Sequence, residues 1–94
     1  MMTILELLNE MIADAKEHQA QLANVGVDSV FASAIVQIQA YNHAREEVAV
    51  LESARDELGQ DHLIGADWAS HFPYQSMRDI AFSLLRFIAK AVGE

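Results

Sequence analysis

Apolar residues recur along residues 3–24 with the alternating three- and four-residue spacing of an amphipathic helix. The stripe is formed by Ile4, Leu8, Met11, Ala15, His18 and Leu22. This spacing places its members on one face of an α-helix. Thr3 and Glu6 match a capping box, in which each side chain binds the other residue's backbone N–H. The pattern therefore predicts a first helix over residues 3–24.

A second helix is predicted over residues 28–58, which contain neither proline nor glycine. Asp28 is a favourable residue type for its N-terminal cap. The apolar side of the first half holds Phe31, Ile35, Ile38 and Tyr41, and that of the second half holds Ala44, Val48, Leu51 and Leu58. The second set lies roughly 100° further around the helix. We therefore expect a bend near residues 41–45, or two ends that pack against different elements.

The length of this second helix predicts a second chain. About thirty residues of helix span roughly 45 Å, whereas a compact domain of this size is about 30–35 Å wide. The surplus length is therefore solvated, bent or covered by a second chain, and the apolar residues of the distal end favour a second chain. We expect the first half to belong to the chain's own bundle, and the second half to hold either the bend or the contact with a twin. The predicted homodimer contacts are Val48, Val50, Leu51 and Leu58.

A third helix is predicted over residues 74–92, after an irregular stretch with room for a short helix near 61–70. Its main apolar face consists of Met77, Ile80, Leu84, Phe87, Ile88 and Ala91. The preceding stretch concentrates aromatic side chains at Trp68, Phe72 and Tyr74. Such residues either anchor a protein interface or close the end of a bundle. Together the patterns predict an all-α helical bundle, with residues 1–94 forming a single domain.

Charge decides which partners this bundle could attract. The net charge is −8, from fourteen acidic and six basic residues. Such a chain repels nucleic acid phosphates and attracts a basic protein surface. Glu6, Glu10, Asp14 and Glu17 line the polar side of the first helix. We expect the partner to contact these four acids together with Trp68, Phe72 and Tyr74; an ordinary solvated face is the alternative.

Composition also bears on location. The chain has no cysteine, which fits the cytosol, and its first residues lack the basic start of a signal peptide. The longest apolar run, residues 80–92, is short and carries Arg86 and Lys90. We therefore expect a cytoplasmic protein that neither spans nor binds a membrane.

No catalytic or cofactor-binding motif is visible. Asp14 and His18, and likewise His43 and Glu47, are one helical turn apart and could each offer two metal ligands. The two pairs do not converge in any simple packing of the helices, so we expect no metal, cofactor or catalytic site. A small metalloprotein or enzyme that uses these four residues is the alternative.

These observations favour a non-catalytic protein-binding protein over an enzyme. Small, acidic, cysteine-free helical proteins are common among regulators and inhibitors carried by phages and other mobile elements, which is an analogy of composition only. A structural subunit of a larger assembly is a further alternative. The expected partner is a protein with a basic surface.

Overall fold

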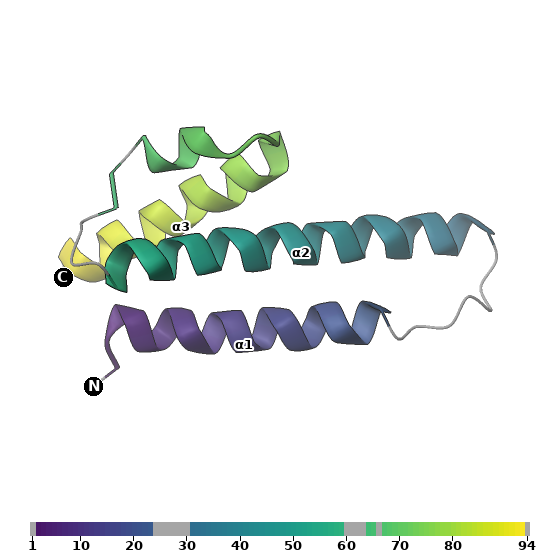
Figure 1. The fold of residues 1–94 in the computed structure, drawn as a ribbon, viewed down its shortest axis with the longest axis horizontal. Helices are drawn as coiled ribbons and strands as arrows, with labels where there is room; N and C mark the ends of the chain where they lie inside the picture. Colours follow the sequence, from purple (N-terminus) through teal and green to yellow (C-terminus); the bar gives the residue numbers. More distant parts are fainter. Residues whose placement is uncertain (1, 24–30, 60–63, 66, 94) are drawn as a thin grey trace.

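The computed structural model describes residues 2–23, 31–59, 64–65 and 67–93, with the side chains of 31–34 left out. In these residues the chain forms α1 (Ile4–Ala23), α2 (Phe31–Gly59), a short 3₁₀ helix η1 (Trp68–His71) and α3 (Gln75–Gly93), and no strand (Figure 1). The predicted all-α fold is confirmed. The short helix expected near 61–70 is η1, at the end of that range. The cap predicted at Asp28 lies outside the described residues.

The predicted capping box begins α1. The Glu6 N–H donates to Thr3 Oγ1 at 3.1 Å, and the Thr3 N–H donates to Glu6 Oε2 at 3.4 Å. These bonds satisfy two of the backbone donors that a helix start leaves free. Further along α1, the apolar stripe buries Leu8 and Ala15. His18, expected on the same face, is exposed instead.

Helices α1 and α2 form an antiparallel hairpin, and α3 lies against the C-terminal half of α2 (Figure 1). Near the end of the hairpin where α2 begins, Gln19 Nε2 donates to the Tyr41 hydroxyl at 3.3 Å. At the start of α3, the Ser76 hydroxyl donates to the Glu46 carboxylate. This contact shows that α3 begins alongside the middle of α2.

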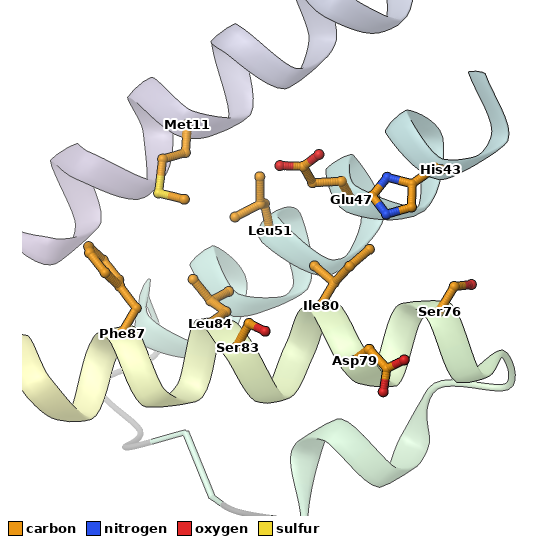
Figure 2. A pocket seen from close by; sticks show the side chains of 10 residues that line it. All are labelled: Met11, His43, Glu47, Leu51, Ser76, Asp79, Ile80, Ser83, Leu84 and Phe87. Carbon is orange, nitrogen blue, oxygen red and sulfur yellow. The ribbon is translucent and has the colours of Figure 1, made fainter. Parts of the chain in front are cut away.

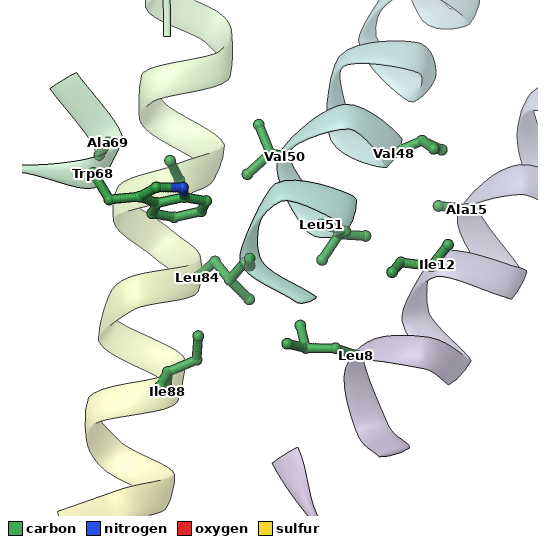
Figure 3. Close-up of a cluster of buried hydrophobic side chains, with 12 residues drawn as sticks. Leu8, Ile12, Ala15, Val48, Val50, Leu51, Trp68, Ala69, Leu84 and Ile88 are labelled. Atoms are coloured by element: carbon green, nitrogen blue, oxygen red, sulfur yellow. The ribbon is translucent and has the colours of Figure 1, made fainter. Parts of the chain in front are cut away.

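The core lies where α1, α3 and η1 meet the C-terminal half of α2 (Figure 3). Leu51 lies near its centre, with Leu8 and Ile12 of α1 on one side and Leu84 of α3 on the other (Figure 3). Burial of such apolar side chains is the main favourable term in folding. The buried cluster comprises Leu8, Ile12, Ala15, Val48, Val50, Leu51, Ala54, Trp68, Ala69, Ala81, Leu84 and Ile88.

The structure reverses the expected roles of the two halves of α2. Val48, Val50 and Leu51, predicted as homodimer contacts, are buried in the chain's own core, and Leu58 packs against that core. Because α1, α3 and η1 cover this half, the structure places Val48, Val50 and Leu51 in the core and not on a free surface. A homodimer remains a prediction. The first half was expected inside the bundle, yet Ile35, Val36 and Ile38 are exposed.

The helix α2 runs without interruption through residues 41–45 and is drawn as one nearly straight helix in Figure 1. Of the two predicted alternatives, the structure therefore has the one in which the two halves of the helix have different neighbours. The molecule measures 47 × 29 × 22 Å, with a radius of gyration of 15.1 Å. A compact chain of this length has a radius of gyration of about 12 Å. The extended shape follows from α2, which continues beyond the start of α3 (Figure 1).

None of the helices in the described part of the chain is long and apolar enough to cross a membrane.

Candidate functional site

A groove of about 650 Å³ runs between α1 and α3 over the side of α2 (Figure 2). It exists because α3 packs mainly on α2 and η1 and not closely on α1. Five apolar and five polar residues line it: Met11 from α1; His43, Glu47 and Leu51 from α2; and Ser76, Asp79, Ile80, Ser83, Leu84 and Phe87 from α3. Its volume falls within the range of about 300–1,000 Å³ typical of ligand sites.

The apolar part of the groove combines core residues with surface residues. Leu51 and Leu84 are almost fully buried and form its floor. Met11 and Phe87 come from facing helices (Figure 2). The Phe87 side chain is 40% exposed, which is high for a large aromatic residue beside the core. An occupant of the groove would therefore bury apolar surface that the chain leaves open to solvent.

The polar part of the groove is acidic. Glu47 projects from α2 between the helices, and Asp79 stands on the α3 side (Figure 2). Gln75 Nε2 donates to Asp79 Oδ1 at 2.9 Å, which holds that carboxylate at the start of α3. None of the ten lining residues is a lysine or arginine. The groove thus offers carboxylates to a cationic ligand beside an apolar floor.

The four residues considered for metal binding are not brought together. His43 and Glu47 line the groove, whereas Asp14 and His18 are exposed on α1. The described residues contain no group of three or more histidine, aspartate or glutamate side chains that could hold a metal ion. A metalloprotein based on these pairs would therefore have two ligands in the groove, fewer than metal sites in proteins ordinarily use.

The acidic side chains expected to meet a partner do share a surface. Glu6, Glu10, Asp14 and Glu17 are all exposed along α1. On the same helix, Lys16 forms an ion pair with Glu52 of α2, in which Lys16 Nζ lies 3.8 Å from Glu52 Oε2. A bridge of this length between exposed groups contributes little stability. Glu10, Asp14 and Glu17 are therefore available to a partner or to solvent, while Glu6 also accepts the Thr3 N–H of the capping box.

The three aromatic residues expected at the partner surface have different environments. Trp68 is only 8% exposed, and its indole N–H donates to Ser53 Oγ at 2.9 Å. Its ring meets Phe72 edge to face, with centroids 5.2 Å apart. Trp68 is thus a core residue that holds η1 against α2, which matches the alternative in which these aromatic residues close the bundle. Phe72 is partly buried against the core, and Tyr74 is exposed.

Sequence reasoning did not identify the groove. The one visible signal is the breadth of apolar character on α3, which leaves Phe87 exposed at the groove and Phe82 and Val92 exposed outside it. Comparisons with protein families, with curated proteins and with solved structures find no match for this chain. Function is therefore inferred from the groove and the charges around it.

Proposed function

We propose that this protein is a non-catalytic binding module that accepts a basic amphipathic helix of another protein in the groove between α1 and α3. The observation that carries this proposal is the pairing of an apolar floor with an acidic rim in one groove. The partner would act through shape and charge, and no bond would be made or broken.

The form of the groove favours a helix as its occupant. Three helices border it, and a fourth helix laid along it would complete a four-helix arrangement. In this mode of recognition the partner presents apolar residues at positions i, i+3, i+4 and i+7 to the floor of the groove. Met11 and Phe87, on facing helices, are placed to contact such residues from both sides (Figure 2).

Charge favours a basic occupant. Lysine or arginine residues beside the apolar stripe of the partner would meet Glu47 and Asp79. The net charge of −8 and the exposed acids of α1 would attract a basic partner over a longer range. The acidic face predicted from the sequence, Glu6 to Glu17, would thus guide the approach of the partner, while the groove would hold it.

A module that covers a basic helix blocks whatever that helix does, which is the action of a regulator or inhibitor. The composition favours the type carried by phages and other mobile elements. Two other functions remain as alternatives. A structural subunit would bind its assembly through larger, salt-resistant contacts, and a metalloprotein would use His43 and Glu47 in the same groove.

The test is binding of a synthetic helical peptide with leucines at the i, i+3, i+4 and i+7 positions and lysines elsewhere. Replacing Phe87 by alanine should weaken binding about three- to sevenfold, because full burial of such a side chain contributes about 1.5–3 kcal/mol and only its exposed 40% becomes buried on binding. Raising the salt concentration should weaken binding further, since it screens the carboxylates. Fluorescence anisotropy of the labelled peptide measures both effects.

Phe82 provides a matched control, because it is 41% exposed on the same helix but does not line the groove. Phe82→Ala should leave the affinity unchanged. A scrambled peptide of the same composition, which cannot present one apolar face, should bind at least tenfold more weakly. Equal losses in the two phenylalanine variants, or equal binding of both peptides, would show that general acidity and not the groove attracts the peptide.

A further inference from the structure

The N-terminal part of α2 presents a surface that the rest of the described chain leaves bare. Ile35, Val36 and Ile38 are 45%, 64% and 61% exposed. They precede the point where α3 begins, which the bond from Ser76 to Glu46 marks. Figure 1 shows this part of α2 with α1 on one side and α3 further along.

Two of these three residues, Ile35 and Val36, continue the side of α2 on which α3 and η1 pack, whereas Ile38 is aligned with the exposed Asp56. Eighteen residues make about five full helical turns, so residues eighteen apart lie on the same side. Val36 is therefore aligned with Ala54, which is fully buried, and Ile35 is aligned with Ser53, which accepts the Trp68 bond. The apolar side of α2 thus extends beyond the elements that cover it.

The sequence around this surface is poor in charge, because Asp28 is the only aspartate, glutamate, lysine or arginine among residues 18–44. Residues 18–23 of α1 and 31–44 of α2 include no aspartate, glutamate, lysine or arginine, in a chain that has twenty such residues. The two segments lie together, since Gln19 donates to Tyr41 at 3.3 Å. A basic partner would gain no ion pair at these residues. A second copy with net charge −8, however, would meet its least repulsion there.

We propose that the charge-poor surface formed by residues 18–23 of α1 and 35–44 of α2 is the contact through which two copies of the chain associate. The two α2 helices pack side by side about a two-fold axis, so the same patch serves both copies. The chain's own α3 does not reach this part of α2. In the dimer, Ile35 and Val36 of each copy cover the same residues of the other copy instead. The two hairpin ends together form a four-helix contact.

The contact is small. Residues 31–43 of α2 span about 20 Å of helix, which is short for an interface of the standard size of about 1,600 Å². The dimer therefore belongs to the weak, transient class, with a dissociation constant on the order of 10–100 µM. Higher salt tightens it, because salt screens the repulsion between two acidic chains. Binding of the basic peptide in the groove has the opposite dependence on salt.

Sedimentation equilibrium of the whole chain between about 5 and 500 µM tests the proposal. The mass should rise from that of one 10.4 kDa chain toward twice that value. Val36→Glu should weaken the association at least tenfold, because each copy then brings a carboxylate to the contact. Raising sodium chloride from about 50 to 500 mM should strengthen the association of the unmodified chain several-fold.

Val92 provides the control, because it is a valine of similar exposure (62%) near the other end of the molecule. Val92→Glu makes the same change in net charge and should leave the dimer intact, and far-UV circular dichroism checks that both variants fold. A single-chain mass across the whole range would overturn the proposal. So would association that survives Val36→Glu, or that both variants abolish equally.

Discussion

Replacing Leu51 by alanine tests whether this residue belongs to the chain's own core. Leu51 is 2% exposed and lies between α1 and α3 (Figure 3). Loss of a buried leucine side chain costs about 2–5 kcal/mol, from lost burial and the cavity left behind. We expect about 3 kcal/mol here, because three helices surround the site. A domain of this length has a total stability of about 5–14 kcal/mol.

The change should be large in a thermal unfolding experiment. For a domain of this size each kcal/mol lowers the midpoint by about 4–8 °C, so Leu51→Ala should lower it by about 12–24 °C. The assay is far-UV circular dichroism at two protein concentrations about twentyfold apart. The loss should be the same at both, because the side chain packs within one chain.

Leu5 is the matched control, because it is a leucine in α1 that is 39% exposed. Leu5→Ala should cost less than about 1 kcal/mol. If Leu51→Ala cost no more than Leu5→Ala, the packing described for the centre of the core would be refuted. A loss that grew with protein concentration would instead indicate that Leu51 contacts a second chain.

Two further substitutions test local contacts by urea unfolding. Trp68→Phe should lower the free energy of unfolding by about 1–2 kcal/mol, since it removes the hydrogen bond to Ser53 and part of a buried ring. In a protein that already carries Ser53→Ala the same substitution should cost less, whereas additive losses would mean that the hydrogen bond contributes nothing. Thr3→Ala should cost about 1 kcal/mol because Glu6 loses its capping partner, whereas Thr3→Ser should be nearly neutral; equal losses for the two would argue against the capping box.

Much of the fold could be predicted because local signals agree with the final structure. The proline- and glycine-free residues 28–58 include all but the last residue of the long helix Phe31–Gly59. The spacing of Leu8 and Ala15 identified the buried side of α1. The pairing of Thr3 with Glu6 placed the start of that helix within one residue. Each signal depends on a few neighbouring residues, so the sequence is sufficient to read it.

The coverage of α2 could not be predicted in the same way, because both halves of this helix carry apolar stripes. The stripes do not show which half α3 will cover. That depends on where α3 begins, and the Trp68 anchor and the bond from Ser76 to Glu46 fix this point. The sequence therefore predicts a dimer contact for Val50 and a core position for Ile35, whereas in the structure Val50 is buried and Ile35 is exposed.

Of the candidate site, the sequence predicts only the acidic surface of α1 and not the groove. The exposure of Glu10 and its neighbours on α1 follows from their position opposite the apolar stripe. The groove depends on how α3 lies relative to α1, which is a tertiary property with no local sequence signal. Aromatic type likewise did not separate Trp68, which is buried, from Tyr74, which is exposed.

The most direct test of the proposed function is to map where the basic amphipathic peptide binds. Amide signals of the ¹⁵N-labelled protein would be followed by NMR during titration with the peptide. If the groove binds the peptide, saturable shifts are expected along it, at Met11, Glu47, Ser83 and Phe87. Shifts confined to the exposed acids of α1, from Glu6 to Glu17, with the groove signals unchanged, would contradict the proposed function.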